Sequence, residues 1–526
     1  MPDYVIVGGG SAGCVLADGL SADGRATVEL LEAGPPDRAS QIRIPAAYPS
    51  LFGTEYDWAA STVAQPGLAG RELYWPSGRT LGGSSSINAQ IWIRGHRADY
   101  DAWADAGCPG WSYDDVRPYF HRVERRDSAD PGPYGTKGPM WISDLRDPNP
   151  TTEDFLVACG KAGYERLDEL NVASPEGFAP IRVIQHEGQR WSAAEGYLRR
   201  AEPRPNLVVR TGAQALRVLF EGTRAVGVEY ATSGGGTAVV HADREVILSA
   251  GAVASPRLLL ASGVGDPDEL AALGIAVVAP SAEVGRNLQD HAAVRLVLRT
   301  PHPVSLIRSA LSGGLRRYLS EHRGPMTSNL AEAALFARAL PDAPAPDVEL
   351  LWMPVPFNDH GRGKSIGHAL SLCLVLLQPD SRGRVTLRDT DPLSRPRIDP
   401  GYLTDPDGRD LRTFLAGARM AKDLLGTEPL ASWFGDGTEL ARFPDDDEGL
   451  ANFVRTNTET LYHPVGTCRM GEDGGSVVDP ELRVRGTEGL RVCDASVMPT
   501  ITRGHTLAPS LMIAARAVDL VGRAED

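Results

Sequence analysis

The residues with the clearest capacity for chemistry lie at the start of the chain, in Gly8-Gly-Gly-Ser-Ala-Gly13. Gly8 permits a tight turn, Gly10 lets the backbone approach a pyrophosphate, and Gly13 allows a helix to pack closely on a strand. Nineteen residues after Gly13 stands Glu32, whose carboxylate can accept hydrogen bonds from a ribose. The types and spacing of these residues predict a dinucleotide-binding site.

Local elements of the right kind surround this motif. Residues 3–7, which are apolar after Asp3, predict a strand, the glycines open a helix, and residues 28–32 predict the second strand of a βαβ unit. The N-terminus of such a helix offers backbone N–H groups and the positive end of its dipole to a phosphate. A glycine cluster alone is usually an ordinary turn, but strand, helix and acidic residue in register favour cofactor binding.

A second glycine cluster occupies residues 78–88, Gly-Arg-Thr-Leu-Gly-Gly-Ser-Ser-Ser-Ile-Asn. Small residues and hydroxyls at this density let backbone N–H groups meet a flat or anionic ligand directly. The alternative is a flexible surface loop. Because the apolar residues 89–93 follow at once, we expect the cluster to be anchored in a core.

A third glycine-rich segment, residues 251–265, follows a strand predicted at 245–249. Ser255 is expected to be the N-cap and Pro256 the first residue of a helix that ends at Gly263.

Imidazole groups are well suited to accept a proton near neutral pH. Among the eleven histidines, His463 lies in Leu461-Tyr-His-Pro464, and His505 follows 42 residues later, just before a helix predicted at 509–517. A histidine taken alone more often has a structural role, and His291 in Asn-Leu-Gln-Asp-His is interpreted in that way. The others carry no motif that distinguishes them from surface or loop residues: His96, His121, His186, His241, His302, His322, His360 and His368.

Composition narrows the class of protein. A chain of 526 residues usually forms more than one domain, and 42% apolar with 23% charged residues is typical of a globular protein. The net charge of −15 argues against nucleic acid or an anionic membrane as a partner. Six scattered cysteines form no metal-binding pattern, so we expect free thiols and no metal. Without a signal segment or a long apolar span, a cytoplasmic protein that does not cross a membrane is expected.

The remaining chain alternates helices and strands. A helix is expected at 151–163 and another at 410–425. Alternating or apolar runs predict strands at 206–211, 214–220, 225–230, 238–241, 334–336, 348–353 and 369–377, with a hairpin turn at 233–237. Trp352 and Phe357 are expected in the core rather than in a substrate pocket, whereas Tyr462 is adjacent to His463.

Residues 78–101 and 251–265 resemble the two signature segments of the glucose-methanol-choline (GMC) family of FAD-dependent alcohol oxidoreductases. The similarity extends over essentially the whole chain, through residues 284–291, 381–387, 462–471 and 491–494, and points to the branch that includes choline dehydrogenase and aryl-alcohol oxidase. It implies a mixed α/β fold with a Rossmann-like FAD-binding domain and a discontinuous substrate domain of sheet and helices. The implied ranges are 1–150, 205–295 and 455–526 for the FAD domain, and 151–204 and 296–454 for the substrate domain.

The resemblance assigns roles to individual residues. It makes His463 the main catalytic base and His505, where the family has Asn or His, the group that orients the substrate oxygen; shared roles stay open. Ile87 stands where some relatives attach FAD covalently through histidine, so noncovalent FAD is expected. The implied FAD-binding residues are Gly8, Gly10, Ser11, Ala12, Gly13, Glu32, Ala33, Arg79, Gly82, Gly83, Ser84, Asn88, Ala89, Ala215, Ala250, Gly251, Asp494, Ala495 and Thr506. For Asp494 a helix-capping role is the alternative.

The implied activity is oxidation of an alcohol to an aldehyde or ketone, by hydride transfer to flavin N5 with a histidine base. The reduced flavin would pass its electrons to oxygen or to a quinone-like acceptor. Relatives of this fold also include a hydroxynitrile lyase and a light-driven decarboxylase, so a reaction without net oxidation is an alternative. A flavoprotein without enzymatic activity is a weaker one. The particular alcohol and the oligomeric state are left open.

Overall fold

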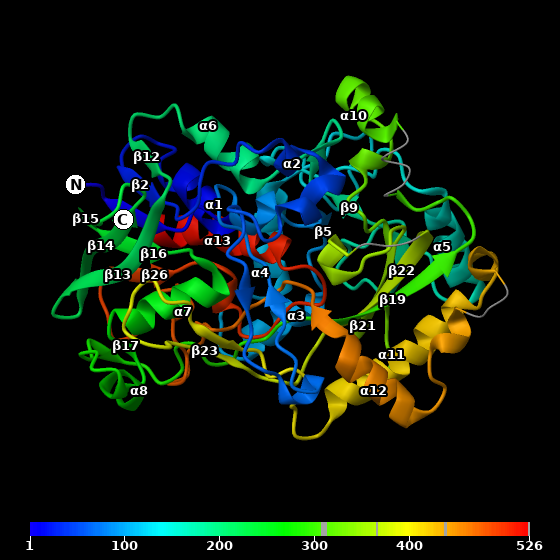
Figure 1. The fold of residues 1–526 in the computed structure, drawn as a ribbon. Coiled ribbons are helices and arrows are strands. Elements are labelled where there is room, and N and C mark those ends of the chain that lie inside the picture. The colour runs from blue at the N-terminus through cyan, green and yellow to red at the C-terminus, as the bar shows by residue number, and fades with distance from the viewer. Residues whose placement is uncertain (307–312, 364–366, 436–438, 524–526) are drawn as a thin grey trace.

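A computed structural model of the protein describes residues 1–306, 313–363, 367–435 and 439–523. Two sheets organise the chain (Figure 1). In the first sheet, segments from the beginning, middle and end of the chain lie side by side, at the end of the molecule that also holds the N-terminus. The second sheet lies at the opposite end, between helices drawn in cyan and yellow.

The first sheet has five parallel strands in the order β12-β2-β1-β16-β26. These strands span Tyr4–Val7 (β1), Val28–Leu31 (β2), Leu207–Arg210 (β12), Glu245–Leu248 (β16) and Leu490–Val492 (β26). The glycine motif lies between β1 and helix α1 (Ser11–Leu20), as the βαβ prediction required. The mixed fold with a Rossmann-type FAD-binding region, implied by the sequence, is confirmed.

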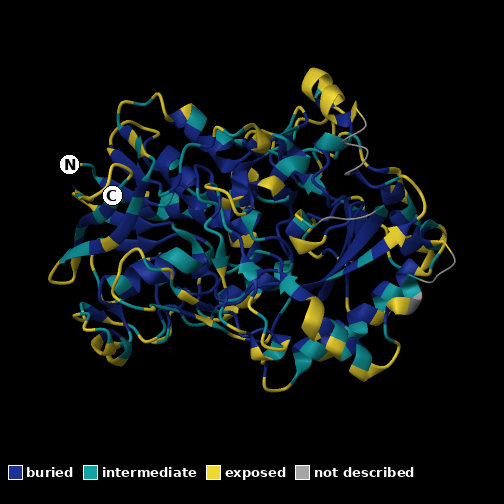
Figure 2. Ribbon diagram, in the orientation of Figure 1, coloured by how far each residue is buried: buried dark blue, intermediate teal, exposed yellow. Residues whose placement is uncertain are grey.

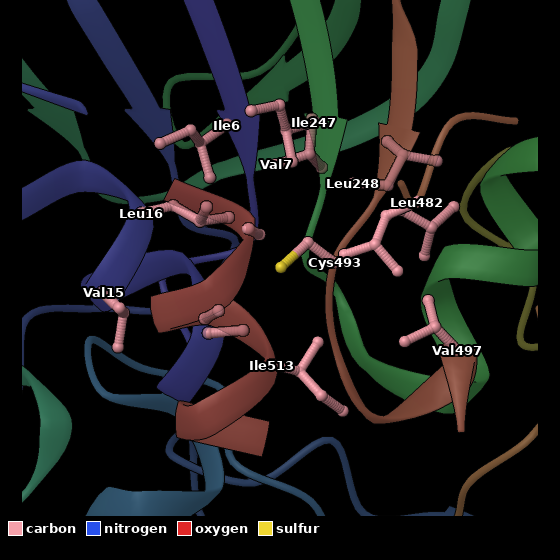
Figure 3. Close-up of a cluster of buried hydrophobic side chains, with 14 of the residues drawn as sticks. Ile6, Val7, Val15, Leu16, Ile247, Leu248, Leu482, Cys493, Val497 and Ile513 are labelled. Carbon is pink, nitrogen blue, oxygen red and sulfur yellow. The ribbon is translucent and has the colours of Figure 1, made fainter. Parts of the chain in front are cut away.

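The core beneath this sheet explains why distant segments come together. Figure 3 shows Ile6 and Val7 of β1 beside Ile247 and Leu248 of β16, above side chains of α1 and of helix α13 (Leu507–Arg523), which carries Ile513. Strands buried on both faces need apolar side chains throughout, and these strands have them. Burial of α13 against α1 brings the C-terminal helix beside the N-terminal glycine motif.

The second sheet has six strands in the order β25-β19-β22-β21-β20-β8, and all of its pairs are antiparallel. These strands span Gly177–Pro180 (β8), Ala292–Thr300 (β19), Ala333–Ala337 (β20), Val348–Met353 (β21), His368–Leu376 (β22) and Thr458–Thr460 (β25). The strands predicted at 334–336, 348–353 and 369–377 are confirmed. The division into two domains with the stated ranges stays a prediction.

Both faces of the second sheet are buried (Figure 2), and each packs on a different part of the molecule. Leu350 and Trp352 of β21 belong to the apolar cluster that includes helices α5 (Pro150–Lys161), α11 (Arg409–Leu425) and α12 (Asp447–Asn457). Leu351 and Met353 face the other side, in the cluster that contains Leu461 beside His463. Side chains alternate between the two faces of a strand, so Glu349 points to the same side as Leu351 and Met353, toward Leu461 and His463.

The predicted strands of the central hairpins are also confirmed, as β13 (Ala213–Glu221), β14 (Arg224–Thr232) and β15 (Thr237–His241). The six cysteines, all within the described residues, are buried and unbridged. No helix in the described ranges combines the length and apolarity needed to cross a bilayer.

The predicted start of one helix was wrong. Helix α7 spans Gly251–Ala261, so it begins before Ser255, and Pro256 lies inside it. Proline lacks the N–H that would bond the carbonyl of Ala252 one turn earlier. The hydroxyl of Thr467 donates to that carbonyl instead, at 2.6 Å, which is how the helix tolerates the proline. The predicted stop at Gly263 is confirmed to within two residues: α7 ends at Ala261, and Gly263 follows the C-cap Ser262 with φ of 85°.

Replacing Thr467 with valine is expected to destabilise the protein by about 1–3 kcal/mol, because it leaves the buried Ala252 carbonyl without a donor. The free energy of unfolding, from urea titration of the holoprotein, measures this cost. Thr456→Val is the matched control, since its exposed hydroxyl donates to carbonyls of its own helix and accepts from the neighbouring Asn457 side chain. An equal effect of both substitutions would contradict the role given to Thr467.

Candidate active site

The first and second glycine clusters meet in space. The N–H of Gly82 donates to the carbonyl of Gly9 at 2.7 Å, and a Cβ built on Gly83 would lie 2.7 Å from the Gly10 Cα. The second cluster forms a 3₁₀ turn, Gly83–Ser86, that is largely buried. The cluster is therefore anchored, as the sequence predicted, and is not a flexible surface loop.

The space beside these clusters fits a dinucleotide. A Cβ on Gly8 would lie 2.5 Å from the carbonyl oxygen of Ser249, so β1 and the segment after β16 approach too closely for a side chain. A Cβ on Gly10, in contrast, would find no atom nearer than 3.9 Å, and one on Gly251 would find none within 4 Å. Open space beside backbone N–H groups at the start of α1 is what a pyrophosphate requires.

Glu32 is oriented by the glycine motif itself. Its carboxylate accepts hydrogen bonds from the N–H of Gly9 at 2.8 Å and from the N–H of Gly34 at 2.7 Å. Burial raises the pKa of Glu32 to about 7, and the two N–H donors act in the opposite direction. The side chain is thus held beside the first cluster, and its hydrogen bond to a ribose stays a prediction.

Asp494 connects the third segment to the C-terminal part of the chain. One carboxylate oxygen accepts from the N–H of Gly251 at 2.8 Å and the hydroxyl of Ser255 at 2.6 Å. The other accepts from the N–H of Ser496 at 2.8 Å and its hydroxyl at 2.5 Å, which caps the turn Ala495–Val497. The capping alternative describes these contacts, and the contact with the ribityl-phosphate part of FAD stays a prediction.

Asn88 is held by an arginine that the sequence interpretation missed. The Asn88 side-chain oxygen accepts from Arg190 at 2.7 Å, and Arg190 also donates to the carbonyls of Ile42 at 2.8 Å and Ser85 at 3.1 Å. Burial without a carboxylate partner lowers the pKa of Arg190 to about 9. One of its nitrogens is buried without a hydrogen-bond partner. Arg190 therefore fixes the orientation of Asn88 from a distant segment.

The other predicted FAD-binding residues lie on the same elements. Ser11, Ala12 and Gly13 form the first turn of α1, and Ala33 follows β2. Ala215 lies in β13, whose first residue donates its N–H to the Glu32 carbonyl at 2.8 Å. The Arg79 guanidinium lies 5.2 Å from the centre of the Trp58 ring. The Ser84 hydroxyl accepts a hydrogen bond from the Gly78 N–H at 3.1 Å. The Ala89 carbonyl accepts one from the Asn329 side chain at 2.8 Å. Ala250 precedes α7 and Thr506 precedes α13.

The two predicted catalytic histidines come together. The rings of His463 and His505 lie 4.8 Å apart, centroid to centroid, at an angle of 78°. Burial holds the pKa of His463 well below its usual range, and the neighbouring His505 and His291 add to this. The His463 ring is therefore neutral at pH 7 and retains a lone pair that can accept a proton.

The motif of residues 287–291 clamps the two loops that carry these histidines. Asp290 accepts from the backbone N–H of His463 at 2.7 Å, and Gln289 exchanges backbone hydrogen bonds with Val465 at 3.1 and 2.9 Å. The Gln289 side-chain oxygen also accepts from the N–H of Ile501 at 3.2 Å, on the loop leading to His505. Burial raises the pKa of Asp290 to about 6. One short motif thus fixes both loops relative to each other.

His291 is in direct contact with His463. The Nδ1 atoms of the two rings lie 2.9 Å apart, and the Nε2 of His291 lies 3.1 Å from the carbonyl oxygen of Leu377. The ring is fully buried, which lowers the pKa of His291 to about 3. The sequence predicts a structural role for His291, and the structure places its ring against that of the predicted base.

His505 has a carboxylate partner that the sequence interpretation missed. Its Nε2 lies 3.3 Å from an oxygen of Glu349, whose other oxygen is buried without a hydrogen-bond partner. Glu349 is the one charged residue in the apolar strand β21. An isolated carboxylate in a buried strand was the available signal, because such a group requires a partner.

Tyr462 joins a polar network next to His463, as its adjacency predicted. Its hydroxyl lies 3.1 Å from Arg295 and 2.7 Å from Nδ1 of His360, a histidine without any motif in the sequence. The backbone of Tyr462 has φ of 68°, a left-handed conformation that is costly for this residue and is concentrated at functional sites. Trp352, in contrast, stacks on Phe155 in the core, as expected.

The stability of a His360→Gln variant is expected to depend on pH in a characteristic way. Burial lowers the pKa of His360 to about 3, so as pH falls below 6.5 the unfolded chain binds a proton that the folded protein does not. The histidine therefore costs about 2 kcal/mol more stability at pH 5 than at pH 7. The variant should lose that dependence, and its stability relative to the parent should rise by this amount. Unfolding free energies at both pH values test this, with exposed His241→Gln as control; a pH-independent difference for His360→Gln would contradict it.

Comparisons with known proteins identify the family of this chain. The N-terminal and C-terminal family models of GMC oxidoreductases match residues 2–293 and 379–514. An uncharacterised GMC-type oxidoreductase of Mycobacterium tuberculosis is 46% identical, covering 99% of each chain. An alcohol dehydrogenase [acceptor] of Pseudomonas putida is 43% identical over all of this chain and 96% of its own, and an oxygen-dependent choline dehydrogenase of Brucella anthropi is 38% identical over 99% and 96%.

Among solved structures, pyridoxine 4-oxidase from Mesorbium loti has a TM-score of 0.90 with 33% identity and 99% coverage of both chains. The chain belongs to the GMC oxidoreductase family. It is an FAD-dependent oxidoreductase that acts on CH–OH groups.

Proposed function

We propose that this protein oxidises an alcohol to an aldehyde or ketone, with His463 as the base that takes the hydroxyl proton. One observation carries the proposal: His463 lies 4.8 Å from His505, ring centroid to centroid, and burial keeps it neutral. When bound, FAD supplies the ring that accepts the hydride from the alcohol carbon. A neutral imidazole accepts the proton as the hydride leaves, so that charge does not accumulate on the substrate oxygen.

His505 is proposed to orient the substrate oxygen. Glu349 lies within reach of its Nε2 at 3.3 Å, so that nitrogen carries a hydrogen and the ring is fixed by strand β21. The proximity of His505 is one cause of the lowered pKa of His463, after burial. The two histidines therefore have different environments, which supports different roles.

Residues at the helix and strand ends are proposed to hold FAD without a covalent bond. The ADP part and the ribityl chain of FAD would contact Gly8 to Gly13, Glu32 and the second glycine cluster. The flavin ring would contact Asn88 and Ala89. Helix α13 begins directly after His505 and Thr506, so its N-terminal N–H groups are available to stabilise negative charge there. Ile87, with no nucleophilic side chain, is consistent with noncovalent attachment.

The names of the relatives support a small alcohol as the substrate of this chain. They are compatible with two kinds of electron acceptor. The named relatives act on an alcohol, on choline and on pyridoxine, and one is called oxygen-dependent. We propose a small-molecule alcohol for this chain, with oxygen or a quinone-like compound receiving the electrons.

Anaerobic mixing of the holoprotein with a panel of alcohols tests this function. At least one alcohol is expected to bleach the oxidised flavin absorbance and to yield the corresponding aldehyde or ketone. Parallel assays with oxygen and with an artificial quinone then identify the acceptor. If no alcohol reduces the flavin but a cyanohydrin is cleaved, the protein is a lyase and the proposal fails.

A further inference from the structure

The buried ring of His291 bridges a backbone carbonyl and the proposed base. Its Nε2 lies 3.1 Å from the Leu377 carbonyl oxygen, and its Nδ1 lies 2.9 Å from Nδ1 of His463. The rings are nearly perpendicular, at 80°. A carbonyl oxygen can only accept a hydrogen bond, so Nε2 of His291 must carry the hydrogen.

The hydrogen on Nε2 of His291 also determines which nitrogen of His463 carries a hydrogen. A neutral His291 with hydrogen on Nε2 has a lone pair on Nδ1, and that atom can only accept. The hydrogen between the two rings then belongs to Nδ1 of His463. Because His463 is also neutral, its Nε2 is left with the lone pair. The arrangement selects one of the two tautomers of the ring.

We propose that His291 is a positioning residue that fixes the tautomer of His463, so that Nε2 of His463 is the atom that accepts the substrate proton. The inference rests on the proposed function of His463. When His463 takes the proton, its Nδ1–H continues to donate to His291, whose other nitrogen is committed to a carbonyl that cannot accept a proton. The proton therefore stays on His463, and His291 is no relay.

The backbone carbonyls of Leu377 and Thr502 both accept from the His291 ring, and neither nearby carboxylate bonds the ring of His463. Asp290 accepts from the backbone N–H of His463 rather than from its ring, and Glu349 is engaged with His505. The backbone carbonyl of His291 accepts from the Leu461 N–H at 2.9 Å whatever side chain stands at this position. The side chain can thus be changed while the backbone clamp is kept.

Two substitutions separate positioning from a structural role. His291→Asn can place its side-chain oxygen where Nδ1 was, so it retains the acceptor for His463. His291→Leu removes the acceptor and leaves the Nδ1–H of His463 unpaired, which favours the wrong tautomer. We expect His291→Leu to reduce flavin about 10²-fold more slowly than the parent. His291→Asn should be within about tenfold of the parent, since general-base catalysis through Nε2 is retained.

The tautomer itself is measured by ¹⁵N NMR of the histidine-labelled holoprotein, with His463→Gln used to assign the signals. The expected result is hydrogen on Nδ1 of His463 in the parent and in His291→Asn, and on Nε2 in His291→Leu. FAD content and the melting temperature check that each variant is folded, and His241→Leu, an exposed histidine, is the control.

Hydrogen on Nε2 of His463 in the parent overturns the proposal, even if His291→Leu does not fold. Equal losses of rate in the Asn and Leu variants, with an unchanged tautomer, also overturn it. If no alcohol reduces the parent flavin, the proposed function fails, but the NMR result still decides whether His291 fixes the tautomer.

Discussion

His463→Ala is expected to lower the rate constant for flavin reduction by the substrate alcohol about 10²–10⁴-fold, while FAD still binds. The alanine cannot accept the hydroxyl proton, and no second base takes its place because His291 is committed to Leu377 and His505 lies beside Glu349. Anaerobic stopped-flow measurement of the flavin absorbance gives the rate constant.

A matched control for this variant is His121→Ala, which removes an exposed ring on helix α4 (Tyr113–Val123) and should leave the rate unchanged. His505→Ala gives a further comparison, since loss of an orienting group should raise KM as well as lower kcat. An undiminished rate in His463→Ala would remove this residue from the mechanism. A larger loss in His505→Ala than in His463→Ala would exchange the two roles.

Gly13→Ala is expected to prevent formation of the FAD-bound protein. A Cβ at this position would lie 1.9 Å from the carbonyl oxygen of Gly8, so either α1 or the turn after β1 has to move. Overpacking at a buried site typically costs about 1–3 kcal/mol, and the displaced backbone is the proposed pyrophosphate site. The ratio of flavin absorbance to protein absorbance after purification, together with the melting temperature, measures both effects.

Gly234→Ala is the control for this substitution. It adds the same methyl group in an exposed hairpin turn where a Cβ would meet no atom within 4 Å. We expect full FAD content and a melting temperature close to that of the parent. A fully flavinated Gly13→Ala protein with unchanged stability would show that the close approach of α1 to the first turn is not required.

Local patterns predicted much of the fold. The strand, glycine motif and helix at the N-terminus follow from a few adjacent residues, because turn conformation and strand alternation depend on near neighbours. The predicted start of helix α7 was wrong because it depends on a contact with a distant residue. Serine followed by proline is a common local start of a helix, but the hydroxyl of Thr467, more than two hundred residues away, lets Pro256 lie in the interior.

Long motifs identified His463 and His505, but their partners came from the fold. His291 reaches His463 across 172 residues, and Glu349 reaches His505 across 156. Neither partner has a local pattern that names its role. Glu349 is one charge in an apolar strand, and His291 belongs to a motif whose other members bond backbone groups.

By itself the sequence determined that this protein binds a dinucleotide, belongs among FAD-dependent alcohol oxidoreductases, and carries two candidate catalytic histidines, because glycine turns, strand periodicity and motifs are encoded by neighbouring residues. Only the tertiary structure decided which nitrogen of His463 is free, what His505 faces and what orients Asn88. Those properties depend on hydrogen bonds between strands and loops far apart in the chain, and such contacts exist only once both sheets are packed.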